Sequence, residues 1–437
     1  MELKKYKKKR ITPQGWKEVT LADAFNTSSG ATPLSTEASY YENGTIPWIN
    51  SGELANPYIY GTTNFISQAG FENSSTEIYP IDTVLVAMYG ATAGKASLLK
   101  MEACTNQAIC AILPNKDYSS TFLKYSIDTL YDHLVGLSSG SARDNLSQAE
   151  LKKLKLIMPP TKDEQNKLVS ILALIDRKIE LNRAINQNLE AMAKQLYDYW
   201  FVQFDFPNEE GKPYKSSGGA MVWNETLKRD IPEDWNDCVL GDYIGRITNG
   251  LNPRKNFVLG NGNNYYVTIR SLAGTTIDWN NCDRCDDEAL AKINSRSQLQ
   301  IGDIIFSAIG TIGRTYYILE EPSNWNISET SFTLRAKNNV PNDFFYGMLR
   351  SNEIQIKSDK AAMGSTLRCL VMDSLCSLLY VKVPKKIMCT FSAKVSPLYR
   401  QIHQNNKEIA ELTKQRNELL PLLMNGQVSV NSDLSDD

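Results

Sequence analysis

Several residues in this 437-residue chain have types and spacings that could support nucleotide chemistry. Gly90-Ala-Thr-Ala-Gly-Lys95 follows an apolar run and is similar to a phosphate-binding loop, in which backbone N–H groups and a lysine bind the phosphates. Its glycines are four positions apart instead of five, and Ala96 stands where a serine or threonine must meet the metal ion. The later segment Gly310-Thr-Ile-Gly-Arg314 has no lysine. The pattern therefore argues against nucleotide binding.

Metal binding and nucleophilic catalysis find equally little support. Cys282-Asp-Arg-Cys285 has no second CxxC, and the only histidines, His133 and His403, are remote from it in the sequence. Neither histidine has a recognisable nucleophile beside it. We also find no Gly-rich dinucleotide fingerprint and no methyltransferase, helicase or nuclease motif. These absences predict a binding protein, not an enzyme.

Composition describes an ordinary globular chain of two or three domains. Of the 437 residues 42% are hydrophobic, and 47 basic residues against 49 acidic ones give a net charge of −2, so any nucleic-acid surface must be local. The apolar stretches are too short to span a bilayer, and the basic residues 1–10 lack the apolar run of a secretory signal. We therefore expect a cytoplasmic protein without a membrane span. Two readings of the basic tail stay open: a solubilising end, or an arm that contacts phosphates.

An internal repeat organises the chain. At a shift of about 220 residues, Pro13 to Leu21 matches Pro232 to Leu240, and Ile81 to Gly90 matches Ile301 to Gly310. Gly30 likewise matches Gly250. Each copy contains short strand patterns and Gly-rich turns, and a long helical pattern follows it. The repeat predicts a globular segment and a helix, twice.

The helical patterns have coiled-coil spacing, with apolar residues recurring at alternating steps of four and three. The predicted seam of the first helix comprises Leu168, Leu172, Ile175, Ile179, Asn182, Leu189 and Leu196. The predicted seam of the second comprises Leu398, Ile402, Asn405, Ile409, Leu412 and Leu419. We expect the helices to pack antiparallel about a pseudo-twofold axis, although ordinary core helices in larger domains would be an alternative.

Two further expectations depend on this seam. Asn182 and Asn405 are equivalent positions near its middle, so we expect them to face each other and to fix the register. Apolar residues outside the seam exceed what two helices can bury, which predicts a protein partner. The residues expected at that partner interface are Tyr197, Tyr199, Phe201, Leu420 and Leu422.

Two similar globules separated by stiff helices could read two patches of one extended ligand, and duplex DNA offers such half-sites. Basic residues stand at corresponding places in Gly- and Ser-rich loops of the two copies, where they could approach phosphates and base edges. The candidate DNA-binding residues are Asn50, Lys95, Arg143, Arg254, Lys255, Arg270, Arg314 and Arg368.

The chain resembles the specificity (S) subunit of type I restriction-modification systems along nearly its whole length. The resemblance rests on Pro232-Glu-Asp-Trp235, which opens a repeat, on Ile46-Pro-Trp-Ile-Asn-Ser-Gly-Glu53 and on Gly310-Thr-Ile-Gly-Arg314, in two repeats with long helices between them. The closing segments of the helices, Trp200 to Pro207 and Leu419 to Val428, also contribute. The segment Ile46 to Glu53 has only a loose counterpart in the second copy, near Tyr266 to Ser271, so no DNA base can be assigned to any residue.

The resemblance implies an α+β (mixed α/β) fold with two target recognition domains separated by two long antiparallel coiled-coil helices. It also implies two modification (methyltransferase) subunits as partners, which supply S-adenosylmethionine and methylate adenine in double-stranded DNA. Two restriction subunits using ATP and Mg can join them, and no cofactor is expected in this chain. The expected boundaries are residues 1–160 (first recognition domain, with its basic tail), 161–206 (first helix), 207–384 (linker and second recognition domain), 385–428 (second helix) and 429–437 (acidic flexible tail).

The resemblance thus implies a non-catalytic subunit in which each domain reads one half of an asymmetric bipartite DNA site and the helices set the gap. Two alternatives remain at this point. One is a single-chain DNA methyltransferase or endonuclease whose catalytic motif is not recognisable, and the other is a coiled-coil scaffold that binds proteins only.

Overall fold

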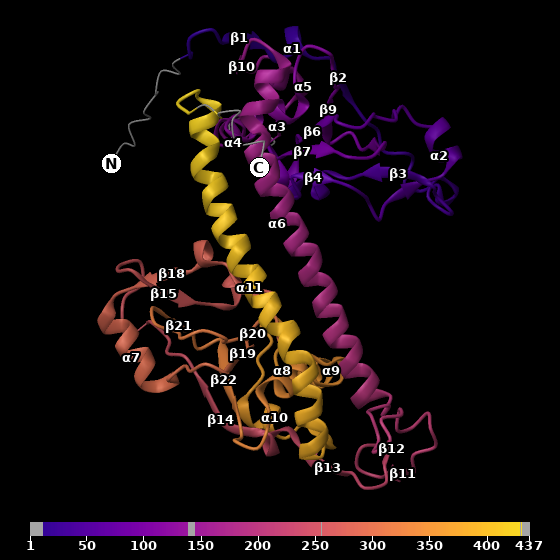
Figure 1. Cartoon of the computed structure of the whole chain (residues 1–437), viewed down its shortest axis with the longest axis vertical. Helices are drawn as coiled ribbons and strands as arrows, with labels where there is room; N and C mark the ends of the chain where they lie inside the picture. Colours follow the sequence, from indigo (N-terminus) through magenta and orange to yellow (C-terminus); the bar gives the residue numbers. More distant parts are fainter. Residues whose placement is uncertain (1–11, 139–144, 255, 429, 431–437) are drawn as a thin grey trace. The chain divides into compact units, whose positions relative to one another are not determined.

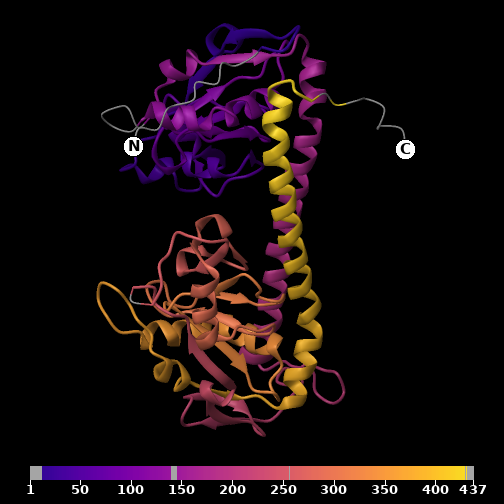
Figure 2. The same ribbon diagram turned by 90° about the vertical axis from the view of Figure 1, so that its left-hand side faces the viewer.

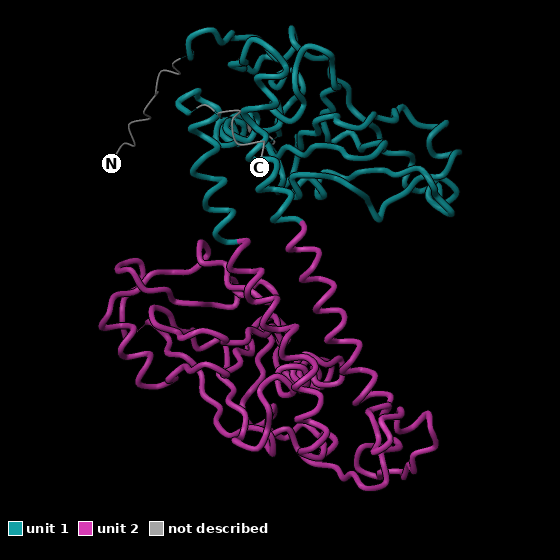
Figure 3. Tube along the Cα trace, in the orientation of Figure 1, with its two compact units in different colours: residues 1–180, 410–437 teal, residues 181–409 magenta. Residues whose placement is uncertain are grey.

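The computed structural model describes residues 12–138, 145–254, 256–428 and 430, and it divides into two compact units. Unit 1 comprises residues 1–180 and 410–437, and unit 2 comprises residues 181–409 (Figure 3). Two long helices, α6 (Lys162–Tyr197) and α11 (Lys385–Met424), each contribute a segment to both units (Figure 1). They confirm the two helices that the seam predicts. The predictions for residues 1–10, 431–437, Arg143 and Lys255 concern positions outside the described residues.

Unit 1 contains three small sheets. The largest has the strand order β2-β9-β6-β7-β4, the second has the order β5-β3-β8, and β1 pairs with β10. The strands are β1 (Lys17–Thr20), β2 (Thr27–Ser29), β3 (Ile46–Ile49), β4 (Tyr58–Ile59), β5 (Phe65–Ile66), β6 (Val84–Ala87), β7 (Ala96–Leu99), β8 (Cys104–Thr105), β9 (Ile109–Ile112) and β10 (Lys155–Met158). The shorter helices are α1 (Leu21–Ala24), α2 (Gln68–Glu72), α3 (Ser120–Asp128), α4 (Tyr131–Ser138) and α5 (Gln148–Lys152).

Unit 2 repeats this plan. Its sheets have the orders β14-β22-β19-β20 and β18-β15-β21, β13 pairs with β23, and two hairpins join β11 to β12 and β16 to β17. The strands are β11 (Met221–Asn224), β12 (Arg229–Pro232), β13 (Asn236–Val239), β14 (Ile244–Asn249), β15 (Asn264–Val267), β16 (Leu272–Ala273), β17 (Thr276–Ile277), β18 (Asp283–Cys285), β19 (Ile304–Ser307), β20 (Thr315–Tyr317), β21 (Trp325–Ile327), β22 (Ser331–Ala336) and β23 (Leu379–Lys382). The helices are α7 (Asp287–Ser297), α8 (Asn342–Arg350), α9 (Asn352–Ala361) and α10 (Met372–Cys376). Within unit 2 the sheets lie to one side of its helix segments (Figure 2).

One pair of glycines shows how closely the two units repeat each other. A Cβ on Gly30 would lie 1.8 Å from the carbonyl oxygen of Thr105 at the end of β8. A Cβ on Gly250 would lie 1.8 Å from the carbonyl oxygen of Ile327 at the end of β21. No side chain fits at either position, since the two backbones touch there. The matched glycines therefore mark the same approach of loop to strand, and they confirm the internal repeat.

Within each unit the segments of α6 and α11 pack against each other along the predicted seam. Every seam residue named above is buried or half-buried. In unit 1, Arg416 Nη1 donates to Asp176 Oδ1 at 3.0 Å across the seam, and the Asp176 side chain is also 3.7 Å from Lys124. In unit 2, Asn182 Nδ2 donates to Glu408 Oε2 at 2.7 Å.

The hydrogen bonds correct the predicted pairing of Asn182 with Asn405. Asn405 Nδ2 donates to Asn186 Oδ1 at 2.8 Å, and Asn186 Nδ2 donates to Asn406 Oδ1 at 2.8 Å. Asn405 thus pairs one helical turn further along α6 than expected. The prediction placed Asn182 and Asn405, which the repeat aligns, directly opposite each other. Instead Asn182 lies opposite Glu408 and Asn405 lies opposite Asn186, so the centre of the antiparallel pairing falls between positions 182 and 186 of α6.

The end of α6 belongs to the core of unit 2. Helix α6 is followed directly by a π-helical turn, η4 (Asp198–Val202), in which Trp200 and Phe201 are buried. Phe201 packs edge-on against Phe344 of α8 and Phe391 of α11, with ring centroids 5.1 and 5.0 Å apart. These rings close the core of the unit against the helices.

Candidate nucleic-acid interface

In unit 2, β15 ends in a short 3-10 turn, η6 (Ile269–Ser271), that exposes a cation. The Arg270 side chain is 72% exposed, and its nearest charged partner, Asp283 Oδ2, is 3.9 Å away. An exposed ion pair at this distance contributes little, so the guanidinium is available to another acceptor. The turn continues into the β16–β17 hairpin, which places Arg270 at the base of that hairpin.

The Gly-rich turn after β19 holds η6 in place. Gly310 and Gly313 both have positive φ, at 83° and 87°, which makes a tight reversal possible. Arg314 follows it, and its Nη1 donates to the carbonyl oxygens of Ile269 at 3.0 Å and Leu272 at 3.1 Å. One guanidinium N–H group thus bridges both ends of the turn that carries Arg270.

These two loops border one open pocket with a volume of about 630 Å³. The structure therefore brings together two of the predicted residues, Arg270 and Arg314, and adds Arg350 and Gln355 from α8 and α9. Gln355 Nε2 donates to the Gly313 carbonyl at 3.0 Å and supports the Gly-rich turn from below. The lining mixes apolar residues with three arginines, of which Arg350 is paired with Glu190, and the charge of Arg270 and Arg314 suits an acidic ligand.

The other candidates of unit 2 lie elsewhere. Arg368 binds the end of α9: its Nη1 is 3.3 Å from Asp359 Oδ2, and its Nη2 donates to the carbonyls of Asp359 and Ala362. This is the usual way in which an arginine caps a helix C-terminus. Arg254 is exposed, and among the described residues it makes no hydrogen bond or ion pair. Neither residue lines the pocket around Arg270.

Unit 1 has the same pair of loops with different side chains. The turn after β3 is η2 (Ser51–Ala55), and the Gly-rich turn after β6 contains η3 (Gly90–Thr92). Thr92 Oγ1 donates to the Ser51 carbonyl at 2.8 Å and so joins the two turns. Asn50 caps η2 and accepts a hydrogen bond from Asn106 Nδ2 at 3.2 Å, so it serves to position the turn.

Lys95 is the exposed cation of the unit 1 loops. Its Nζ lies 4.1 Å from the centroid of the Tyr131 ring. This contact holds the ammonium near the surface without neutralising its charge. Lys95 and Arg314, which the repeat aligns, therefore differ: the lysine stands over an aromatic ring, while the arginine binds backbone carbonyls.

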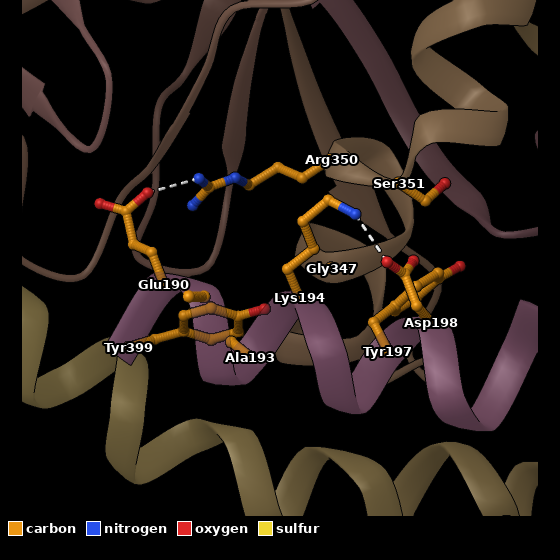
Figure 4. A pocket seen from close by; sticks show the side chains of 10 residues that line it. Glu190, Ala193, Lys194, Tyr197, Asp198, Gly347, Arg350, Ser351 and Tyr399 are labelled. Atoms are coloured by element: carbon orange, nitrogen blue, oxygen red, sulfur yellow. Dashed lines mark hydrogen bonds and ion pairs between the residues drawn. The ribbon is translucent and has the colours of Figure 1, made fainter. Parts of the chain in front are cut away.

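A second pocket of unit 2, with a volume of about 320 Å³, lies among α6, α8 and α11 (Figure 4). Figure 4 shows Arg350 reaching from α8 to Glu190 of α6, and Arg350 Nη2 is 2.6 Å from Glu190 Oε2. Lys194 is paired with Asp198 at 2.6 Å in the same wall. The four charged side chains that line this pocket are thus paired with one another, and these pairs join α6 to α8 and one turn of α6 to the next residues.

The sequence did not reveal Gln355, Arg350 or Glu190, because none of them stands in a distinctive motif, and it did not single out Thr92. Thr92 lies inside Gly90-Ala-Thr-Ala-Gly-Lys95, which the repeat aligns with the turn that ends in Arg314. That alignment is the signal that could have found it. Glu190 lies on a helix whose seam drew attention to its apolar residues only. Their roles depend on contacts between segments that are far apart in the sequence.

The structure corrects the predicted partner interface at two residues. Tyr197 and Phe201 are 2% and 1% exposed and belong to the core of unit 2, where Tyr197 OH is hydrogen-bonded to Tyr380 OH. The seam pattern could not show that α8 and β23 cover this side of α6. Leu420 is half-buried against the core of unit 1, whereas Tyr199 and Leu422 are exposed.

The segment Cys282-Asp-Arg-Cys285 was considered above as a metal site. Among the described residues no group of His, Cys, Asp and Glu could hold a metal ion. Burial raises the pKa of both Cys282 and Cys285, which disfavours the thiolate that a metal requires. No helix in the described part of the chain is long and apolar enough to cross a membrane.

Comparison with known proteins gives one consistent result. Residues 13–191 match the family model of the type I restriction modification DNA specificity domain. The chain is 29% identical over 431 residues to the type I restriction enzyme MjaIX specificity subunit of Methanocaldococcus jannaschii, a match covering 96% of this chain and 94% of the relative. It is 24% identical to the HindI specificity subunit of Haemophilus influenzae, covering 69% of this chain and 74% of that one.

The fold agrees with a solved structure. The type I restriction-modification system S subunit from M. genitalium matches with a TM-score of 0.58 at 17% identity, covering 93% of this chain and 96% of that one. The sequence match therefore extends over both units, and the fold match does so as well. In sequence the chain is thus similar to type I restriction enzyme specificity subunits over nearly its whole length, and in fold it is similar to a solved S subunit.

Proposed function

We propose that this chain is the DNA-recognition subunit of a type I restriction-modification complex and that each unit reads one half of an asymmetric, gapped DNA site. One observation carries the proposal. The same two loops, a 3-10 turn after the central strand of the small sheet and a Gly-rich turn, are joined in both units, but by Thr92 in one and by Arg314 in the other. A shared frame with different side chains is what two different half-sites require.

The charges suit this role. The net charge of −2 gives no overall attraction to DNA, so binding depends on local cations. Lys95 in unit 1 and Arg270 in unit 2 are exposed on the joined loops, and Arg254 is exposed on a separate loop of unit 2. Arg143 and Lys255 remain candidates on sequence grounds. Exposed cations on loops held by a rigid frame can contact both phosphates and base edges.

Helix α6 supports the docking of a protein partner. Leu181, Ile185, Met192 and Tyr199 are exposed at steps of four and seven residues, so they form one apolar stripe away from the seam. The repeat aligns Leu181 and Ile185 with Gln404 and Glu408 of α11, so α11 has no matching stripe there. We propose that methyltransferase subunits, which hold S-adenosylmethionine, dock on this stripe together with Leu422. Restriction subunits using ATP and Mg would join the same cytoplasmic complex.

The test is a selection experiment with the subunit bound to its methyltransferase partner. The complex is mixed with a duplex library that is randomised over 24 base pairs, and the retained DNA is sequenced. We expect a gapped motif with two different half-sites and an affinity that falls steeply as salt rises. Methylation or cleavage of DNA by the subunit alone would instead favour a single-chain enzyme. A complex that retains no DNA at low salt would favour a protein scaffold.

A further inference from the structure

Arg270 and Arg314 line the same pocket, yet their surroundings differ. Arg270 is 72% exposed, and its one ion pair, with Asp283, is long. Arg314 has its Nη1 committed to two backbone carbonyls, and its backbone N–H donates to Ser307 Oγ at 2.7 Å. Both side chains are exposed, but only that of Arg314 is tied by hydrogen bonds to the turn that carries Arg270.

The bridge made by Arg314 determines where Arg270 can point. Its two acceptors, Ile269 and Leu272, stand on either side of Arg270 and Ser271. Ser271 is fully buried, and its Oγ donates to the Asn281 carbonyl at 2.9 Å. The backbone on both sides of Arg270 is therefore fixed, and only its side chain extends into the pocket. Base-edge recognition needs this kind of positioning, because bidentate hydrogen bonds tolerate little misplacement.

The hairpin that continues from this turn has a further anchor within unit 2. Thr275, at the tip between β16 and β17, donates to Glu190 Oε1 of α6 at 3.3 Å. Asn406 Nδ2 of α11 lies 3.2 Å from Thr275 Oγ1. The segment is thus held at its base by Arg314 and at its tip by both helices.

Unit 1 provides an independent comparison. There Thr92 joins the Gly-rich turn to the 3-10 turn by donating to the Ser51 carbonyl. The next residue, which corresponds in position to Arg270 after Ile269, is the exposed Gly52, which carries no side chain. Of the two joined loops of unit 1, the Gly-rich one carries the exposed cation Lys95. The positioning contact recurs between the units, whereas the exposed cation that binds no backbone carbonyl of the described residues stands on the Gly-rich loop in unit 1 and on the 3-10 turn in unit 2.

We infer that Arg270 reads a base edge in the second half-site and that Arg314 is a positioning residue that holds the Arg270 turn, so that the recognising cation stands on different loops in the two units. This inference rests on the proposed function and specifies its contacts in unit 2. Arginine binds guanine N7 and O6 through two parallel hydrogen bonds, so a guanine is the expected partner of Arg270.

The test compares variants of the full subunit in complex with its methyltransferase partner, using the randomised duplex library. For Arg270→Gln we expect the preference at one base pair of the second half-site to fall about 10-fold or more, with the first half-site unchanged. Lys212→Gln is the matched control, because Lys212 is an exposed cation of unit 2 outside the pocket and its loss should change neither half-site. An Arg270→Gln complex with the wild-type motif would overturn the assignment.

Arg314 requires a readout that separates positioning from phosphate contact. For Arg314→Gln we expect a relaxed second half-site and an unchanged salt dependence of binding to a non-specific duplex, with partial recovery in Arg314→Lys. A phosphate contact would instead lower the slope of log K against log salt by about 0.9 and leave the base preferences intact, and that result would overturn the positioning role. Thermal unfolding of each variant separates these outcomes from loss of the fold.

A corresponding variant in unit 1 keeps the inference testable if Arg314 variants fold poorly. Thr92→Val removes the hydroxyl that joins the two loops, and we expect it to relax the first half-site only. An unchanged first half-site would contradict the positioning role of the Gly-rich turn. If the wild-type complex itself selects no gapped motif, the proposed function fails. A normal wild-type motif with unaffected variants defeats only the present inference.

Discussion

Arg350 of α8 and Glu190 of α6 form an ion pair at 2.6 Å, and the same Glu190 carboxylate accepts a hydrogen bond from Thr275. Glu190 therefore connects three elements of unit 2: the seam helix α6, helix α8 and the hairpin that continues from Arg270. Both charged side chains are about one-third exposed, so this ion pair is intermediate in burial between an exposed and a fully buried one.

Glu190→Gln should destabilise unit 2 by about 1 to 2 kcal/mol. The half-buried Arg350 loses its counter-charge, whereas the glutamine side chain keeps the size and shape of the glutamate. Urea unfolding measures this change, and hydrogen exchange should show faster opening of residues 272–277. Lys194→Gln is the control. Its pair with Asp198 is more exposed, so its loss should cost less than about 0.5 kcal/mol. Equal effects of both variants would contradict the connecting role of Glu190.

The Asn186–Asn405 hydrogen bond should show strong coupling in a double-mutant cycle. Both side chains are buried, and Asn405→Leu leaves the Asn186 carbonyl oxygen without its donor. Each single change to leucine should cost about 1 to 3 kcal/mol in the free energy of unfolding. The double variant should cost less than the sum, because no unpaired group remains between the two positions. Strict additivity would show that the two amides do not interact.

Asp343 should give unit 2 a measurable pH dependence. Burial raises the pKa of the Asp343 carboxyl, although hydrogen bonds from Tyr317 and Ser396 oppose that rise. A folded-state pKa above the unfolded value near 3.8 means that the folded state binds the proton more tightly. The stabilisation is complete below the unfolded pKa and is lost as pH rises through the folded pKa.

Wild type should therefore gain stability relative to Asp343→Asn as the pH falls from 7 toward 4. Chemical unfolding at a series of pH values checks this directly. A stability difference that does not change with pH, or that moves the other way, would contradict the raised pKa.

The helices should set the gap of the DNA site. Removing seven residues from each helix, 180–186 from α6 and 405–411 from α11, keeps both heptad patterns and shortens each helix by about 10 Å. At 3.4 Å per base pair we expect the gap in the selected motif to shrink by about three base pairs, with both half-sites unchanged. A changed half-site with an unchanged gap would contradict this role.

The sequence predicted the helices and the repeat well, because heptads and matched segments are local patterns. Leu172, Ile179 and Ile402 are buried, as a seam position requires. It could not place Tyr197 and Phe201, whose burial depends on α8, nor the pairing of Asn405, which a shift of one turn along α6 changes.

The loop residues show the same limit more sharply. Arg314 and Lys95 look alike in the aligned sequences, but one binds carbonyls of a loop more than forty residues away and the other stands over Tyr131. Charge and position in a motif indicate that a residue could contact DNA. Whether its donors are already used depends on the folded neighbours.

The most direct test of the central claim is the adenine methylation pattern of the host genome with this gene intact and with it deleted, in the presence of its native methyltransferase partner. We predict one gapped, asymmetric motif that is methylated in the intact strain and unmethylated after deletion. Reintroducing the Arg270→Gln variant should restore methylation with one relaxed position in the second half-site. An identical methylation pattern in intact and deleted strains, with the subunit and its partner expressed, would contradict the account.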